Sequence, residues 1–145
     1  MKLTTYKGVL LTLFLSITIS VNAQKIPIQI LPSGHIVVKV TVEGKEGNFI
    51  FDTEGGINLF FDSFAKDFKQ ATSYNSLTAH RATGERLSLS IFESKSLQFA
   101  GKTFVNAPYA TFDMKLNGID GLISLQMFGD TDFIIDYENK EIVLT

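Results

Sequence analysis

The chain has 145 residues, of which 45% are hydrophobic and 19% charged, and its formal net charge is -2. This length suits one domain with a hydrophobic core and is too short for two ordinary domains. The absence of cysteine excludes disulfides, thiol nucleophiles and cysteine metal sites, and the presence of only two histidines argues against a histidine-rich metal site. With 13 basic and 15 acidic side chains, the composition does not indicate a basic surface for nucleic acid.

Residues 1–23 have the three parts of a secretory signal peptide. Lys2 and Lys7 form a basic start, an apolar run spans residues 9–19, and small or branched residues precede a predicted cleavage site after Ala23. The apolar run is shorter than the roughly 20 residues that cross a bilayer, so no membrane span is expected after cleavage. An exported chain without cysteine is typical of a bacterial envelope, which predicts a periplasmic or extracellular protein.

The mature chain, residues 24–145, keeps 11 basic and 15 acidic side chains and is predicted to be mostly β-strand. Ile26, Ile28 and Ile30 alternate along the first segment, and β-branched residues fill the second. Turn residues at 43–47 and a polar tip at 80–86 predict two hairpins. In chain order, strands are predicted over residues 26–31, 36–42, 48–51, 77–79, 87–92, 97–99, 103–112, 133–137 and 141–144.

Two short helices are expected to interrupt these strands. Asp62 and Ser63 can cap a helix that runs to Lys69, and residues 121–128 are predicted to form a second helix. No repeat or linker is visible, so we predict a single all-β domain. Its two terminal strands, 26–31 and 141–144, would be exposed edges in a single chain, and a partner chain is one way to cover them.

One segment places a carboxylate where chemistry is expected. Asp52 directly follows the apolar strand 48–51 and is followed by Thr53, Glu54 and the pair Gly55-Gly56. A glycine turn at the end of a strand can present a carboxylate to a cleft beside backbone N–H groups. The alternative is that Asp52 is a turn residue bonded to its own backbone, which is also what we expect of Asp136 farther along the chain.

The segment around Asp52 resembles the active-site loop of the retropepsin-like aspartic peptidases, in which an apolar strand leads into Asp-Thr-Gly. The family has a second signature near the C-terminus. It consists of an apolar pair before a glycine and a short helix, then an apolar strand that ends in Asp-Tyr, and a final apolar strand. Similar segments occur in the same order at residues 119–125, 134–137 and 142–144. The resemblance covers nearly the whole mature chain in the right order. It implies a small closed β-barrel with two short helices, of the single-lobe type found in exported bacterial proteins.

In that family two copies meet and each donates one aspartate, so the resemblance implies a homodimer joined through strands 26–31 and 141–144. One carboxylate would deprotonate a water while the other protonates the carbonyl oxygen of a peptide or protein substrate, without a metal or cofactor. For His80 and Arg81 the alternative is a solvated hairpin tip that does not contact the substrate. By resemblance the catalytic residues are Asp52 and Thr53, and the substrate-binding residues are Gly55, Gly56 and, on a hairpin tip that would close over the substrate, His80, Arg81, Thr83 and Gly84.

Two positions depart from the family pattern, because Glu54 and Ser124 stand where the family has glycine. In a dimer, Glu54 would crowd extra carboxylates around Asp52, and activity is then expected to prefer acid. Three functions therefore stay open. They are an exported aspartic endopeptidase, a catalytically silent relative that binds extended peptides by strand addition, and an unrelated β-barrel that carries an apolar ligand.

Overall fold

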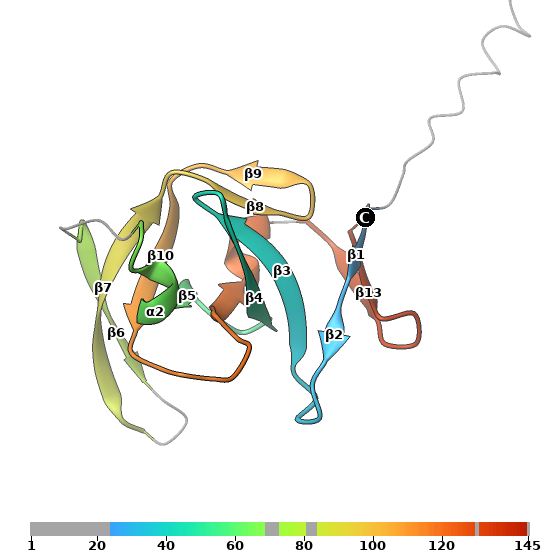
Figure 1. Ribbon diagram of the computed structural model, residues 1–145, viewed down its shortest axis with the longest axis horizontal. Helices are drawn as coiled ribbons and strands as arrows, with labels where there is room; N and C mark the ends of the chain where they lie inside the picture. The colour runs from blue at the N-terminus through green and yellow to red at the C-terminus, as the bar shows by residue number, and fades with distance from the viewer. Residues whose placement is uncertain (1–23, 69–72, 81–83, 130, 145) are drawn as a thin grey trace, which may run out of the picture.

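The computed structural model describes residues 24–68, 73–80, 84–129 and 131–144, so the predicted signal peptide, Arg81 and Thr83 lie outside the described residues. Its strands form two sheets (Figure 1). The strands are β1 Gln24–Pro27, β2 Gln29–Ile30, β3 Ile36–Val42, β4 Lys45–Asp52, β5 Asn58–Phe61, β6 Asn75–His80, β7 Arg86–Ser94, β8 Leu97–Phe99, β9 Lys102–Phe104, β10 Ala107–Phe112, β11 Gly121–Ser124, β12 Phe133–Asp136 and β13 Glu141–Leu144, with the helix α2 Asp62–Ala65 and the 3₁₀ helix η1 Leu125–Phe128.

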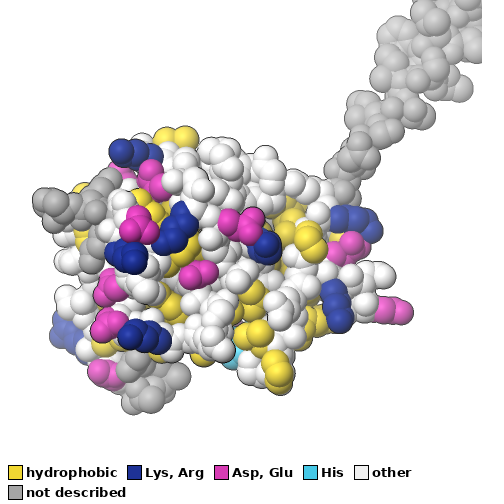
Figure 2. All heavy atoms as spheres, in the orientation of Figure 1, with side chains coloured by type: hydrophobic (Ala, Val, Ile, Leu, Met, Phe, Trp, Pro, Cys, Tyr) yellow, Lys and Arg dark blue, Asp and Glu magenta, His cyan; other side chains and the backbone are white. Residues whose placement is uncertain are grey.

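The larger sheet has ten strands in the order β6-β7-β10-β5-β11-β4-β3-β8-β9, with β2 paired to β3. The prediction of an all-β fold is confirmed. The prediction of a closed barrel is wrong, because no pairing between the described residues joins β6 to β9 and the sheet stays open at those two strands. Acidic and basic side chains are interspersed on the face of the molecule that Figure 2 shows.

The β3–β4 hairpin forms the predicted first hairpin and carries Asp52 at its end. Val38, Val40 and Val42 are buried on one side of β3, as the alternation of the sequence predicted. The turn between the strands contains Glu43 and Gly44, which have φ of 51° and 82°. Two consecutive positive φ values suit a tight hairpin, because that turn matches the right-handed twist of the strands.

The smaller sheet has the order β1-β13-β12 and brings the two ends of the described chain together. Ile142 is fully buried and is the register partner of both Ile26 and Ile135. Nζ of Lys25 lies 2.7 Å from Oε1 of Glu141 across the β1–β13 pair. The expectation that both terminal strands are exposed edges is therefore wrong for β13, because strands of the same chain cover it on both sides.

The first predicted helix is shorter than expected. It spans Asp62–Ala65, and turns continue as far as Phe68, while the expected end at Lys69 lies outside the described residues. Phe61 occupies the N-cap position and provides no side-chain hydrogen bond, so Asp62 lies in the first turn and is not the cap. A carboxylate there still interacts favourably with the helix dipole.

The second predicted helix is mostly wrong, because Gly121–Ser124 forms strand β11 between β4 and β5. A Cβ atom at Gly121 would lie 2.2 Å from the backbone oxygen of Leu59, so only glycine permits this close pairing. Helical structure begins at Leu125 and lasts for one 3₁₀ turn. Ser124 caps that turn, since its Oγ accepts a hydrogen bond from the backbone N–H of Gln126 at 3.1 Å.

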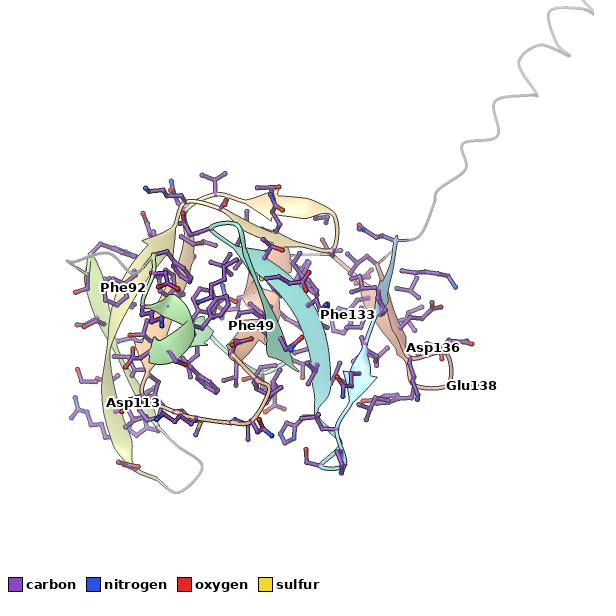
Figure 3. The ribbon with its side chains drawn as sticks, viewed as in Figure 1. Phe49, Phe92, Asp113, Phe133, Asp136 and Glu138 are labelled. Carbon is purple, nitrogen blue, oxygen red and sulfur yellow. The ribbon has the colours of Figure 1, made fainter. Side chains whose placement is uncertain are left out.

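The core is filled by aromatic rings that contact one another edge to face. The ring centroids of Phe49 and Phe64 are 5.1 Å apart, and those of Phe49 and Phe60 are 5.5 Å apart. Tyr109 of β10 stacks on Phe60 at 4.6 Å and is fully buried. Phe49 lies in the middle of the molecule in Figure 3. Such offset and edge-to-face contacts stabilise the fold beyond simple burial.

Candidate active site

Asp52 is the last residue of β4 and lies beside Ser124 of β11 in the parallel pairing of the two strands. Its side chain is half-buried. Oδ1 accepts a hydrogen bond from the backbone N–H of Glu54 at 3.1 Å. This bond closes an Asx turn, so the turn role considered for Asp52 is present, and it also fixes the direction of the carboxylate.

Gly55 leaves room for the Asp52 carboxylate where the structure places it. A Cβ atom at Gly55 would lie 2.8 Å from Oδ2 and 3.0 Å from Cγ of Asp52, so any larger residue would push the carboxylate away. At Gly56 the nearest atom to such a Cβ is Nε2 of Gln126 at 4.0 Å, which leaves room for alanine. The glycine beside the carboxylate is therefore Gly55, and the exposed Glu54 contributes its backbone N–H.

Ser124, the second departure from the family pattern, makes hydrogen bonds that stabilise the Asp52 loop. Its Oγ donates a short hydrogen bond to the carbonyl oxygen of Gly55. Its backbone N–H donates to Oδ1 of Asn58 at 3.0 Å, and Nδ2 of Asn58 donates to the carbonyl oxygen of Pro108 at 3.1 Å. Ser124 and Asn58 are 2% and 3% exposed. Buried polar groups that satisfy one another in this way make a loop rigid.

Sequence reasoning missed Asn58. The signal that could have found it is a single amide side chain in the apolar segment 57–61, because a polar residue in a buried strand usually has a specific hydrogen-bond partner.

A surface groove of about 390 Å³ lies beside the carboxylate. Its lining includes Asp52, Thr53 and Glu54, together with His35 from the β2–β3 turn and Tyr137 from the β12–β13 turn. The structure thus brings both predicted catalytic residues into one groove and adds two titratable side chains that sequence reasoning missed. They come from turns far away in the sequence, and no local pattern connects them to the Asp52 loop.

The side chain of His35 is exposed, and its Nδ1 lies 2.8 Å from Oγ of Ser33. A hydroxyl at that nitrogen favours one orientation of the ring.

The predicted hairpin tip lies elsewhere. His80 ends β6 and pairs with Arg86 of β7, and both are exposed. Gly84 has φ of 84° and is also exposed. Neither His80 nor Gly84 lines the Asp52 groove, because β6 and β7 form the edge of the large sheet and β10, β5 and β11 separate them from β4.

Asp136 has the turn role that its sequence context predicted. Its Oδ1 and Oδ2 accept hydrogen bonds from the backbone N–H and the side-chain amide of Asn139 at 2.9 and 2.8 Å. These hydrogen bonds hold the pKa of the Asp136 carboxyl below its ordinary value. Figure 3 shows Asp136 with Glu138 at the β12–β13 turn, on the outside of the small sheet.

Within the described part of the chain, no three His, Asp or Glu side chains gather in a way that could hold a metal ion. The helices of the same residues include none with the length and apolar character needed to cross a membrane.

Comparison with known proteins gives the fold. No protein-family model matches the sequence, and no curated protein does. Among solved structures, the chain is similar to the crystal structure of a retropepsin-like aspartic protease from Rickettsia conorii, with a TM-score of 0.64 over 84% of this chain and 90% of that chain. This chain has a retropepsin-like fold. The sequence identity of 20% shows the fold alone. Within this retropepsin-like fold, Asp52 lies at the end of an internal strand and beside a groove.

Proposed function

We propose that this chain is one half of an exported aspartic endopeptidase, in which Asp52 of two copies activates the water that hydrolyses a peptide bond. The observation that supports this most directly is the carboxylate of Asp52, oriented by the Glu54 N–H and by Gly55 at the edge of a groove in a retropepsin-like fold. Positioned carboxylates of this kind are how proteins carry out acid and base chemistry without a metal.

The reaction needs two carboxyl groups with different roles. One takes a proton from the attacking water, and the other gives a proton to the carbonyl oxygen of the scissile bond. Asp52 of one copy supplies one group and Asp52 of a second copy the other. Thr53 lines the same groove beside each aspartate and helps to form the floor on which the peptide lies.

The small sheet suggests where the second copy binds. β13 is covered on both sides, so a copy that pairs with it must displace β1 or β12. Among the described residues no strand pairs with the outer edge of β12, and Ile134 on this strand and Tyr137 directly after it are 59% and 58% exposed. Ile135 and Tyr137 also line the Asp52 groove. We therefore place the dimer contact along β12 in preference to the terminal strands 26–31 and 141–144, because an edge strand with exposed apolar residues is normally covered. The other edge of this sheet, β1, buries Ile26 and exposes the polar side chains of Gln24 and Lys25.

Export is part of the proposal and depends on residues 1–23 alone. The basic start, apolar run and cleavage pattern predict removal after Ala23 and delivery to the periplasm or the exterior of a bacterial cell. The mass of the protein recovered from the cell envelope tests it, since removal of residues 1–23 leaves Gln24 as the first residue.

A silent, peptide-binding relative is the second candidate, and the exposed carboxylate of Glu54 in the groove is the observation that favours it. A further negative charge beside Asp52 can prevent the paired acids from sharing one proton in the required way. The apolar-ligand carrier is the least supported candidate. Aromatic rings fill the core of the fold, and the apolar space that would suit such a ligand is a pocket of about 290 Å³ beside Ile26, Ile28 and Val38.

The decisive experiment uses protein expressed from the full chain and incubated with an unfolded protein substrate between pH 4 and pH 7. Hydrolysis that disappears in Asp52→Asn and is blocked by a statine-type inhibitor supports the endopeptidase. Hydrolysis that survives in Asp52→Asn refutes it. Peptide binding without hydrolysis supports the silent relative, and hydrolysis gained in Glu54→Gly would identify Glu54 as the cause. Sedimentation at pH 5 and pH 7 measures the dimer.

A further inference from the structure

We infer that the Asp52 groove selects peptides that carry a lysine or arginine side chain, and that Glu54 recognises that side chain. This inference rests on the proposed function, because it names the substrate class of the same groove. Glu54 stands where the family pattern has glycine, and the inference gives this residue a role.

The charge of the groove lining carries the inference. Two carboxylates, Asp52 and Glu54, line the groove, and none of the lysines and arginines that the structure describes does. His35 and Tyr137 are the other titratable residues of the lining. A concave surface with charges of one sign concentrates its field and attracts ligands of the opposite sign. The mature chain adds to this field, because its acidic side chains outnumber its basic ones by 15 to 11.

The carboxylate of Glu54 is available to a ligand. Its backbone N–H is used by Asp52, but the side chain itself is exposed. The ion pairs of the described residues join other carboxylates, those of Glu141, Glu46 and Asp67, to lysines. A lysine or arginine of the peptide can therefore pair with Glu54 without displacing a lysine of the chain.

The apolar part of the groove suits the rest of such a side chain. Ile50, Leu122 and Ile135 line the groove together with the ring of Tyr137. Lysine and arginine lay their methylene groups on apolar surface while the charged end reaches a polar partner. A cation also binds favourably to the face of a tyrosine ring. The same chain shows such a contact, since Nζ of Lys45 lies 4.8 Å from the ring centroid of Phe64.

The test compares binding of two short peptides that differ at one position, lysine in one and the uncharged, equally long norleucine in the other. Protein with Asp52→Asn is used so that the peptides are bound and not cleaved, and fluorescence polarisation gives the affinity. We expect the lysine peptide to bind about fivefold more tightly, which is the upper end of what a partly exposed ion pair supplies. The preference should fall as salt is raised.

Second substitutions in the Asp52→Asn protein identify the residue responsible. Adding Glu54→Gln should weaken binding of the lysine peptide to the level of the norleucine peptide, whereas Glu138→Gln, a change at an exposed residue outside the groove, should leave the preference intact. Equal binding of both peptides, or a preference that survives Glu54→Gln, overturns this inference while the proposed function stands. Absence of binding to either peptide overturns both. Circular dichroism confirms that each variant is folded.

Discussion

Replacement of Asn58 should lower the free energy of unfolding more than replacement of any exposed amide residue of the chain. The side chain is 3% exposed and joins three strands, since Oδ1 accepts from Ser124 N–H at 3.0 Å and Nδ2 donates to Pro108 O at 3.1 Å. Asn58→Leu keeps the approximate volume and removes both bonds. Each bond contributes about 1 kcal/mol, and leaving the buried Ser124 N–H unsatisfied adds about 1 kcal/mol more, so we expect a loss of about 3 kcal/mol.

Urea unfolding followed by circular dichroism measures this loss. With a slope of about 2 kcal/mol/M, the unfolding midpoint of Asn58→Leu should fall by about 1.5 M. Asn48→Ala is the matched control, because Nδ2 of Asn48 makes one exposed hydrogen bond to Gly118 O at 3.2 Å. Its loss should stay below about 1 kcal/mol. If the two variants unfold at the same urea concentration, the buried network of Asn58 and Ser124 does not stabilise the Asp52 loop.

Three further changes test the site and its surroundings. Gly55→Ala should lower hydrolysis about a hundredfold by displacing the Asp52 carboxylate, whereas Gly56→Ala should leave the rate and the melting temperature unchanged; equal rates for both would contradict the packing of the loop. Tyr109→Phe should be neutral or stabilising by about 1 kcal/mol in urea, because the buried hydroxyl has no hydrogen-bond partner among the described residues and its burial raises the pKa to about 12. Because the pKa of Asp136 is lowered from its ordinary value of 3.8, the ionised carboxylate stabilises the fold above that value, and this stabilisation is lost as pH falls through the lowered pKa. The melting temperatures of the wild-type chain and Asp136→Asn should therefore converge between pH 4 and pH 2. A constant difference would refute the turn role.

Local patterns predicted the hairpins well. The β3–β4 and β6–β7 pairs follow from alternating apolar residues on either side of turn-forming residues, and the structure places both hairpins where the sequence indicated. Asp136 also followed from local chemistry, because an aspartate that bonds to the backbone three residues later needs no distant partner. Short-range signals are sufficient where the partner residues are close in the sequence.

Pairings between distant segments could not be predicted in the same way. The apolar segment 121–124 is compatible with a helix or a buried strand, and β4 and β5 decide between them by pairing with it on both sides. In the same way, β1 pairs with β13 at the opposite end of the chain, which no local pattern indicates. The groove depends on such contacts too, since His35 and Tyr137 come from distant turns and line the groove with Asp52 only in the folded chain.

Position 54 shows why a departure from a sequence pattern does not by itself remove a site. The hydrogen bond that orients Asp52 comes from the backbone N–H of residue 54, which every residue except proline can supply. The close contact with the carboxylate lies at Gly55, where the chain keeps its glycine. Glu54 therefore leaves the loop geometry intact and changes only what extends into the groove. The effect of this residue should appear in substrate choice and in the protonation of the two Asp52 side chains of the proposed dimer, not in the folding of the loop.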